Sequence, residues 1–280
     1  MPSPRSRTDR YALVGHPVSH SRSPLIHQLF ARQTGDKITY ELIDAEPEQL
    51  ETAVRGFAAA GGRGMNVTVP HKEAAFELCK THGPEALAAR AVNTISFKQG
   101  SMHGDNTDGT GFIRDVCVNH EQAITAKRVL VLGAGGAARG IIGPILEQRP
   151  KALVIANRTI ERAQDLQQDL GSPPQLSICR FGELEDMEPF DIVINATSAG
   201  IRGEQPPFPV SLVGDKTFCY DLAYSLKPTP FVEWSSSHGA GRAVQGWGML
   251  VEQAADSYAI WRGKRPDTGP ILSQLTKLTA

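Results

Sequence analysis

The chain has 280 residues, of which 40% are hydrophobic and 21% are charged, a composition typical of a globular protein and unlike that of a disordered or collagen-like chain. At roughly 150 residues per domain, this length predicts about two domains. Lys and Arg number 29 against 30 Asp and Glu, which excludes a chain-wide basic surface for nucleic acid or an anionic membrane but leaves room for a local cationic site.

The cysteines and the apolar runs indicate a reducing, aqueous environment. Cys79, Cys117, Cys179 and Cys219 lie far apart and form no C-x-x-C pair, so neither a disulfide scaffold nor a zinc site is expected. The arginine-bearing first ten residues are not followed by a signal-peptide core, and no run of about 18 apolar residues occurs. We therefore expect a cytoplasmic protein without a membrane segment.

From residue 11 to residue 111, short apolar runs alternate with helical patterns, which is typical of an α/β unit. The expected strands are 12–14 and 66–69, and the expected helices are 24–33 and 73–82. Strand-like residues 92–95 and the Gln99-Gly100 turn predict a β-hairpin at the edge of this sheet. A polar, aperiodic stretch at 119–127 then predicts a connection.

The second half of the chain predicts a doubly wound parallel sheet. Buried-strand patterns occur at 128–133, 152–156, 191–195 and 217–221, with a helix to about residue 148 after the first of them. Parallel strands joined by right-handed crossovers are the architecture of a dinucleotide-binding domain. Residues 246–261 predict a long helix, and periodicity alone leaves open which domain it packs against.

A glycine-rich turn joins the first of these strands to its helix. The turn is Gly133-Ala134-Gly135-Gly136-Ala137-Ala138, a match to G-x-G-x-x-G/A in the strand–turn–helix context that this motif requires. Gly133 permits a tight turn, Gly135 lets a pyrophosphate approach the backbone, and Ala138 lets the helix pack closely. The turn therefore predicts dinucleotide binding, the alternative being a glycine-rich turn without a ligand.

The end of the next strand indicates which dinucleotide. An NAD site presents an acidic residue there, whereas this chain has Asn157-Arg158-Thr159 and then Arg162. Cations at a helix start oppose the helix dipole, so two guanidinium groups there suit an anion such as the 2'-phosphate of NADP. Glu161 beside them leaves a solvated helix face as the alternative.

Two serines precede the first predicted helix. Ser23 before Pro24 is explained by N-capping, whereas Ser21 has no such explanation. Two hydroxyls at a helix start predict a pocket for a small carboxylate.

Lys72 is expected in the first turn of a helix that begins near Pro70. A lysine there is locally unfavourable by about 0.3 to 1 kcal/mol, which makes it a candidate for proton transfer. Thr68, Asn93 and Asp108 could converge on it, although a surface lysine remains the alternative. His16, His20, His71 and His103 lack the spacing of metal ligands and no serine lies in G-x-S-x-G, so no metal and no acyl transfer are expected.

These motifs occur in one fixed order between Gly15 and Ala255: GHPVSHSRSP, NVTVPHK, AVNT, GDNTDG, GAGGAAR, NRTIER, INATSAG, YDLAYS and GWGMLVEQAA. Together they resemble the shikimate/quinate dehydrogenase family, whose shikimate dehydrogenases are NADP-linked enzymes of aromatic amino-acid (chorismate) biosynthesis. The resemblance implies an α/β protein with a Rossmann-type, doubly wound NADP-binding domain at 111–245. It implies a second, discontinuous α/β substrate-binding domain with a mixed sheet at 1–110 and 246–280, and an active site in the cleft between the domains.

The resemblance also assigns residues to roles. Lys72 and Asp108 would be the catalytic pair. The substrate would be held by Ser21, Ser23, Thr68, Asn93, Tyr224 and Gln253. NADP would be held by Gly133, Ala134, Gly135, Gly136, Ala137, Asn157, Arg158, Thr159, Arg162, Thr197, Leu222 and Gly246.

The reaction implied is the reversible NADPH-dependent reduction of 3-dehydroshikimate to shikimate, in a monomer or homodimer that binds neither nucleic acid nor membrane. The alternatives are a quinate/shikimate dehydrogenase of the same family and a non-catalytic NADP-binding sensor. Arg158 and Arg162 speak against NAD, and the Lys72/Asp108 pair speaks against a sensor. Gln245, Trp247 and Leu222-Ala223 depart from residues frequent in the family.

Overall fold

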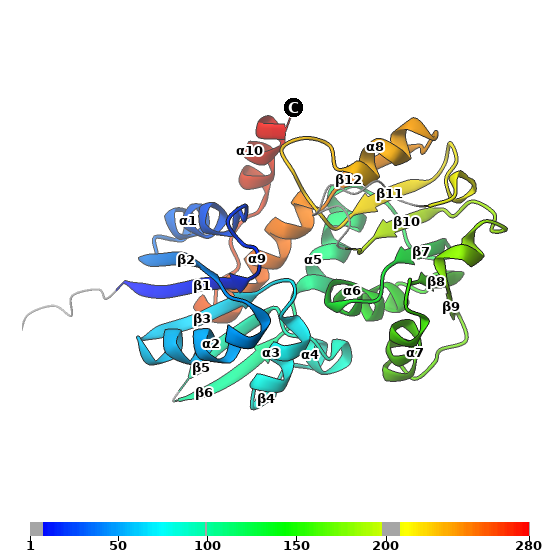
Figure 1. Ribbon diagram of the computed structural model, residues 1–280. Helices are drawn as coiled ribbons and strands as arrows, with labels where there is room; N and C mark the ends of the chain where they lie inside the picture. Colours follow the sequence, from blue (N-terminus) through cyan, green and yellow to red (C-terminus); the bar gives the residue numbers. More distant parts are fainter. Residues whose placement is uncertain (1–7, 99, 198–207, 280) are drawn as a thin grey trace, which may run out of the picture. The chain divides into compact units, whose positions relative to one another are not determined.

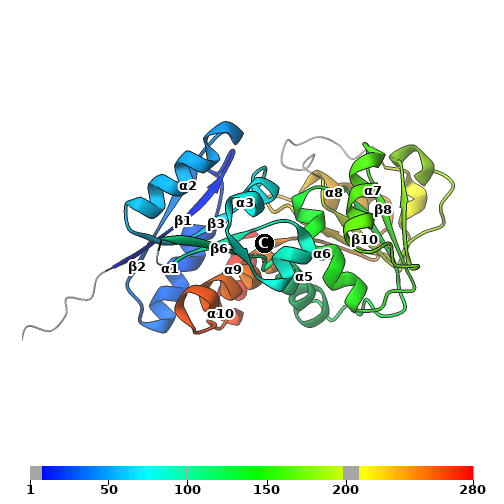
Figure 2. The ribbon, with the colours of Figure 1, turned by 90° about the horizontal axis from the view of Figure 1, so that it is seen from below.

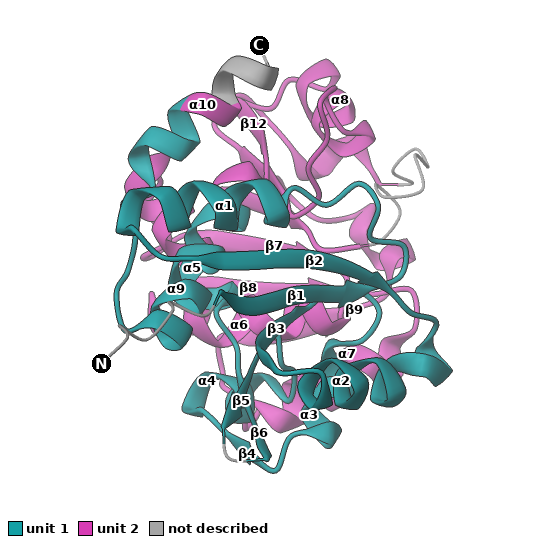
Figure 3. Ribbon diagram, turned by 90° about the vertical axis from the view of Figure 1, so that its left-hand side faces the viewer, with its two compact units in different colours: residues 1–111, 250–273 teal, residues 112–249, 274–280 magenta. Residues whose placement is uncertain are grey.

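The computed structural model describes residues 8–98, 100–197 and 208–279 (Figure 1). The chain forms two compact units, coloured separately in Figure 3. Unit 1 consists of Met1–Gly111 and Leu250–Ser273, and unit 2 consists of Phe112–Met249 and Gln274–Ala280.

Unit 1 is built on a mixed sheet with the strand order β2-β1-β3-β5-β6-β4. Its strands are β1 (Asp9–Gly15), β2 (Ile38–Asp44), β3 (Gly62–Val67), β4 (Thr81–His82), β5 (Thr94–Lys98) and β6 (Ser101–Asp105). β1 pairs in parallel with β2 and β3, whereas β5 runs antiparallel to both β3 and β6. The expectation of a mixed sheet is confirmed.

Helices cover both faces of this sheet. They are α1 (Ser23–Thr34), η1 (Pro47–Gln49), α2 (Leu50–Ala59), α3 (Lys72–Leu78) and α4 (Pro84–Ala89). α1 follows β1 and α2 follows β2, and the two helices lie on opposite faces of the sheet (Figure 2). β1 is therefore the strand at which the winding direction reverses, a position whose carboxyl end commonly binds ligands in α/β folds.

Unit 2 contains an all-parallel sheet with the order β12-β11-β10-β7-β8-β9. Its strands are β7 (Arg128–Leu132), β8 (Ala152–Ala156), β9 (Leu176–Cys179), β10 (Ile192–Asn195), β11 (Phe218–Asp221) and β12 (Arg242–Gln245). Numbered from β7, this is the order 3-2-1-4-5-6 of a Rossmann fold, so the predicted doubly wound architecture is confirmed.

The helices of unit 2 complete two apolar layers against this sheet. They are α6 (Gly136–Glu147), α7 (Ile160–Asp169), η3 (Phe181–Leu184), η5 (Val210–Leu212) and α8 (Pro230–Ser237). Ile141 and Ile145 of α6 and Leu166 of α7 are buried with Val129 and Val131 in one core cluster. A second cluster includes Leu130, Leu132 and Trp234 of α8, because successive side chains of β7 point to opposite faces.

The boundary between the two units differs by a few residues from the sequence expectation. The chain passes from unit 1 to unit 2 within α5 (Asp108–Arg114), which is followed by a π-helical turn at Asp115–Asn119. It returns to unit 1 within α9 (Trp247–Arg262). Residues 246–249, which the sequence expectation placed with residues 1–110, group with unit 2, since Met249 belongs to a core cluster of unit 2. A Cβ atom on Gly248 would overlap the carboxylate of buried Asp115, so this stretch is also tightly packed. Part of α10 (Gly269–Thr279) also groups with unit 2.

Two local expectations in unit 1 need correction. The helix expected over 73–82 ends at Leu78, because Thr81 and His82 form strand β4 beside His103 and Gly104 of β6. The predicted hairpin β5–β6 is present, but β4 lies outside it, so the hairpin is not at the edge of the sheet. None of the described helices is long and apolar enough to span a membrane.

Candidate active site

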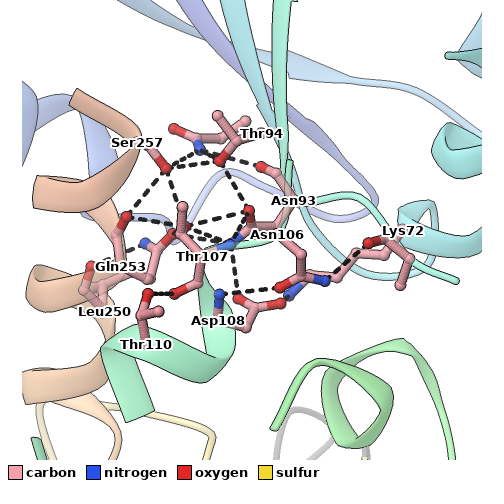
Figure 4. Close-up of polar contacts among 12 residues, drawn as sticks. Lys72, Asn93, Thr94, Asn106, Thr107, Asp108, Thr110, Leu250, Gln253 and Ser257 are labelled. Atoms are coloured by element: carbon pink, nitrogen blue, oxygen red, sulfur yellow. Dashed lines mark hydrogen bonds and ion pairs between the residues drawn. The ribbon is translucent and has the colours of Figure 1, made fainter. Parts of the chain in front are cut away.

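Lys72 is the first residue of α3, directly after the loop that follows β3. Its backbone oxygen accepts a hydrogen bond from Val92 N at 2.9 Å, and its side chain is only 10% exposed. Its Nζ donates to Oδ2 of Asp108 at 2.6 Å (Figure 4). The two residues expected to form the catalytic pair are therefore in direct contact.

Asp108 is the first residue of α5, directly after β6 and its two-residue connection. Its backbone N donates to Oδ1 of Asn106 at 3.0 Å, and Asn106 in turn donates to Ala91 O. A carboxylate at a helix start is favoured by the helix dipole. Its second oxygen accepts a hydrogen bond from Nδ2 of Asn93 at 2.9 Å, so both oxygens of a 3% exposed residue are engaged.

Asn93 connects this pair to α9. Its Nδ2 donates to Asp108 and to Oγ1 of Thr107, and it lies 3.3 Å from Oε1 of Gln253. Thr107 also donates to Gln253 O at 3.0 Å. Lys72, Asn93, Asp108 and Gln253, four of the predicted site residues, are thus brought together within unit 1. Thr107 was missed, because an Asn-Thr-Asp-Gly stretch is also an ordinary turn sequence.

The two serines before α1 have different roles from those expected. Ser23 is already part of the helix, and Arg22 occupies the N-cap position without a side-chain hydrogen bond. Oγ of Ser21 accepts the hydrogen bond of Ser23 N and donates to Oγ of Ser23, both at 3.2 Å. Ser23 as the N-cap is therefore wrong, and Ser21 is the serine that satisfies a free N–H at the helix start.

The loop that holds these serines is anchored to the end of β2. Nδ1 of His16 lies 2.6 Å from Oδ1 of Asp44, and Val18 N donates to the other oxygen of the same carboxylate. The hydrogen bond to Asp44 raises the pKa of His16. A negative charge on Asp44 thus fixes the start of the loop.

Ser21, Ser23 and Thr68 follow strands whose carboxyl ends share one edge of the sheet. β1 and β3 are parallel neighbours with Val14 opposite Val67, so the loops after them begin side by side. Thr68 is half-buried, and its N donates to Val14 O at 2.9 Å. In the described part of the chain, no hydrogen bond joins these three side chains to Lys72.

In unit 2, the glycine-rich turn has the geometry that its sequence predicts. Gly133 has φ +108°, a value that side chains rarely adopt, and a Cβ there would lie 3.0 Å from Ala196 O. Gly135 is the N-cap of α6, and a Cβ there would meet nothing within 4 Å. The turn thus combines a tight backbone with open space in front of a helix start, which fits a dinucleotide pyrophosphate.

The other predicted cofactor residues of unit 2 follow adjacent strand ends. Thr197 donates to Oδ1 of Asn195 from both its N and its Oγ1, and Leu222 N donates to Asn195 O. Asn195 Nδ2 donates to Oδ1 of Asp221 at 3.0 Å. A Cβ on Gly246 would lie 2.6 Å from Leu222 O, so a glycine is required at the end of β12.

Arg158 and Arg162 stand at the start of α7 with exposed side chains. Asn157 beside them donates to Thr159 O at 2.6 Å. Across the described residues, neither arginine has an ion-pair partner, and Glu161 lies 3.8 Å from Arg180 instead. Two uncompensated guanidinium groups beside the glycine-rich turn fit the 2'-phosphate of NADP.

Tyr224 lies in unit 2 and packs against Trp247, with ring centroids 4.7 Å apart. Two of the departures from the family pattern hold this loop. Gln245 accepts a hydrogen bond from Ser225 N at 2.7 Å, and Nε1 of Trp247 donates to Ser225 O. Gln245 and Trp247 therefore have a structural role beside Tyr224.

Comparison with known proteins gives a consistent result along the chain. Three family models match: the shikimate dehydrogenase substrate binding domain at residues 13–95, shikimate / quinate 5-dehydrogenase at 117–201, and the shikimate 5'-dehydrogenase C-terminal domain at 246–276. A shikimate dehydrogenase (NADP(+)) from Alkalilimnicola ehrlichii is 51% identical over 268 residues, which cover 96% of this chain and 98% of that protein.

The chain belongs to the shikimate dehydrogenase family. A second member of this family, from Hahella chejuensis, is 46% identical over 95% of the chain and 98% of its own length. Among solved structures, an Ael1 enzyme from Pseudomonas putida has a TM-score of 0.86 at 43% identity, covering 96% of this chain and 98% of its own.

A shikimate 5-dehydrogenase from Thermus thermophilus, solved in complex with NADP(H) and shikimate, has a TM-score of 0.83 at 30% identity. The match covers 97% of this chain and the whole of that one. The family therefore extends over both units of the chain.

Proposed function

We propose that this member of the shikimate dehydrogenase family catalyses the reversible, NADPH-dependent reduction of 3-dehydroshikimate to shikimate. The observation that carries the proposal is the buried contact of Lys72 with Asp108, supported from the far side by Asn93. The curated relatives bear the name shikimate dehydrogenase (NADP(+)), and the relative from Thermus thermophilus was solved with both NADP(H) and shikimate.

Lys72 is the proton donor of the proposed reduction. Its Nζ gives a proton to the substrate oxygen as the carbonyl carbon is reduced, and in the reverse direction the same nitrogen takes the proton back. Asp108 holds Nζ at 2.6 Å and accepts hydrogen bonds from substrate hydroxyls. Since both side chains are almost fully buried, these hydrogen bonds form with little competition from water.

Ser21 and Ser23 are proposed to bind the substrate carboxylate. The Ser21 hydroxyl donates its hydrogen bond to Oγ of Ser23, so the Ser23 hydroxyl remains free to donate to an anion. Thr68, Asn93, Gln253 and Tyr224 are the remaining residues proposed to hold the substrate.

In unit 2, the N–H groups at the start of α6 and the backbone of Gly133 and Gly135 would hold the pyrophosphate of NADP. Arg158 and Arg162 would pair with its 2'-phosphate, with Asn157 and Thr159 beside them. Ala134, Gly136, Ala137, Thr197, Leu222 and Gly246 complete the proposed set. When bound, NADPH supplies the hydride.

We further propose that the protein acts in the cytoplasm, as a monomer or homodimer. All four cysteines are free thiols, which fits a reducing compartment.

An assay of the purified protein with shikimate or quinate, each with NADP or NAD, tests the function by the absorbance of the reduced cofactor. Turnover restricted to shikimate with NADP is expected. Comparable turnover of quinate with NAD would make the protein a quinate/shikimate dehydrogenase instead. Tight NADP binding without any turnover would make it a sensor and overturn the proposal.

A further inference from the structure

We propose that Ser257 of α9 is a positioning residue for the Lys72–Asp108 pair, through Thr94 and the amide of Asn93. This inference rests on the function proposed above, in which that pair performs the proton transfer. Ser257 itself contacts neither Lys72 nor Asp108 in Figure 4, so it would act entirely through the hydrogen bonds between them.

The hydrogen bond from Asn93 to Asp108 requires one particular orientation of the Asn93 side-chain amide. The backbone N of Thr107 lies 2.9 Å from one end of this amide, and because a backbone N–H can only donate, that end must be the oxygen, Oδ1. The other end is then the NH₂ group, which donates to Asp108 at 2.9 Å. A flipped amide would place an oxygen against the carboxylate, and the two would repel each other.

Thr94 supports the same orientation from a second side. Its Oγ1 donates to Oδ1 of Asn93 at 2.8 Å. Nδ2 of Asn66 faces the carbonyl of Asn93 and is therefore a donor, and it also lies 3.2 Å from Oγ1 of Thr94. The Thr94 hydroxyl is thus held as an acceptor on one side and a donor on the other.

Ser257 is placed to hold that hydroxyl. It has no exposed surface, and its Oγ lies 2.7 Å from Oγ1 of Thr94, the shortest hydrogen bond in this part of the network. Asn66 donates to the same Oγ at 3.0 Å, and Thr107 lies 3.2 Å away. The contacts form a directed series from Ser257 to Thr94, to the oxygen of Asn93, and from the nitrogen of Asn93 to Asp108.

Ser257 also lies one helical turn after Gln253. Its Oγ also lies 3.0 Å from Gln253 O, but that oxygen already accepts a hydrogen bond from Thr107, and the single proton of Ser257 goes to the nearer Oγ1 of Thr94. A buried serine that served only its own helix would donate to the carbonyl four residues earlier. The contacts to Thr94, Thr107 and Asn66 instead link α9 to β5, to the residue before Asp108 and to β3.

The test is Ser257→Ala with Ser235→Ala as the matched control. Ser235 of α8 is equally unexposed and donates to Phe231 O four residues earlier on its own helix, but it lies in unit 2 and is not hydrogen-bonded to the Asn93 network. Loss of one neutral hydrogen bond in the transition state predicts a fall in kcat of about three- to tenfold for Ser257→Ala. Ser235→Ala is expected to lower Tm to a similar extent and to leave kcat within about 1.5-fold.

A pair of variants at Thr94 separates positioning from packing. Thr94→Val removes the hydroxyl at nearly constant volume and should lower kcat as Ser257→Ala does, whereas Thr94→Ser keeps the hydroxyl and should retain most of kcat. The KM for NADP should stay unchanged in both. An unchanged kcat in Ser257→Ala, an equal loss in Ser235→Ala, or an equal loss in Thr94→Ser would overturn the proposal.

Hydrogen exchange of the Asn93 side chain tests the role of Ser257 without any enzyme assay, so it can fail or succeed independently of the proposed function. The side-chain amide protons of Asn93, assigned by their loss in Asn93→Ala, should exchange with solvent more slowly in the wild type than in Ser257→Ala. Unchanged exchange would contradict the role of Ser257 in an active or an inactive protein. A wild type without turnover but with this difference in exchange would refute the proposed function alone.

Discussion

Lys72 and Asp108 are buried together, so the stability of each charge depends on the other residue. Their side chains are 10% and 5% exposed. Removing one partner of a buried ion pair leaves an uncompensated charge, which costs more than the pair itself contributes. Asn93 lessens this cost for Asp108 because it continues to donate to the carboxylate.

The first prediction concerns Lys72→Ala. If Lys72 is the proton donor, kcat should fall by about 10²- to 10⁴-fold, the usual contribution of general acid catalysis, while shikimate still binds. Lys127→Ala is the control, because Lys127 pairs with Asp191 at 3.3 Å on the surface and should leave kcat unchanged. A loss of less than about tenfold in Lys72→Ala, with intact binding, would exclude the acid role.

The second prediction concerns Arg158→Ala. A charge-assisted hydrogen bond to phosphate predicts a rise in the KM for NADP of roughly 10- to 100-fold, with no change in the KM for NAD. Steady-state kinetics with both cofactors measure the effect. Arg55, an exposed helical arginine paired with Glu51 at 2.7 Å, supplies the control variant Arg55→Ala. An equal rise in the KM for NADP and the KM for NAD would mean that Arg158 does not bind the 2'-phosphate.

At the level of secondary structure, each sheet places part of its proposed site at the two strands between which the winding reverses. In unit 1 the flanking loops follow β1 and β3, and in unit 2 they follow β7 and β10. Adjacent carboxyl ends bring together segments far apart in sequence, such as Gly133 and Ala196. The same topological arrangement would therefore serve the two proposed ligands.

The sequence predicts these elements where the pattern is local and strong. Strand β8 and the glycine-rich turn match their expected positions, because a buried parallel strand is a continuous apolar run. The two-residue strand β4 could not be predicted, since its pairing with β6 gives no periodic signal. Ser257 was also missed, because its contact with Thr94 joins residues 163 positions apart and only the folded sheet and helix create it.

The third prediction concerns Asp221, which couples the ends of β10 and β11. Burial raises the pKa of Asp221 to about 6, and the hydrogen bonds from Thr229, Ala223 and Asn195 offset this only in part. Because the folded pKa lies above the unfolded value of 3.8, the protonated carboxyl favours folding, and this contribution is lost as the pH rises from about 4 through about 6. The shift corresponds to about 3 kcal/mol.

Urea unfolding between about pH 4.5 and pH 7.5 measures this effect in the wild type and in Asp221→Asn. The free energy of unfolding of the wild type should fall relative to the variant as the pH rises. Asp191→Asn should show no such trend over this range: burial alone raises the pKa of Asp191, but the hydrogen bonds from Arg128 N and Lys127 outweigh it and lower that pKa below the ordinary value of 3.8, so this carboxyl stays ionised. If the free energy of unfolding differed between wild type and Asp221→Asn by the same amount at every pH, the pKa of Asp221 would not be raised by folding.

At the scale of the whole molecule, unit 1 is assembled from two segments of the chain. The second segment begins at Leu250 and contributes Gln253 and Ser257, which hydrogen-bond to residues of the first segment near Asn93. The proposed substrate residues of this unit are therefore brought together only when both segments have folded. All strands of the unit 2 sheet lie in one segment, Phe112–Met249, and this segment also contains all the proposed cofactor residues.

The last prediction is that the two ligands protect different units from hydrogen exchange. A ligand that binds the folded state stabilises the segments that contact it, which slows their local opening. NADP alone should slow exchange at 133–138 and 157–162, whereas shikimate alone should slow it at 68–72, 93 and 107–108. The segment 250–257 should respond to shikimate, although it lies after unit 2 in sequence, because it belongs to unit 1.

Mass spectrometry of peptides from the exchanged protein resolves these segments, and α2 at Leu50–Ala59, which contains none of the proposed site residues, serves as the reference region. Replacing NADP by NAD should reduce the protection at 157–162 more than that at 133–138, since only the former holds the two arginines. Protection of 250–257 by NADP alone would place these residues with the cofactor. That result would remove Gln253 from the substrate set while leaving the roles of Lys72 and Asp108 intact, because Lys72 donates to Asp108 directly and not through Gln253.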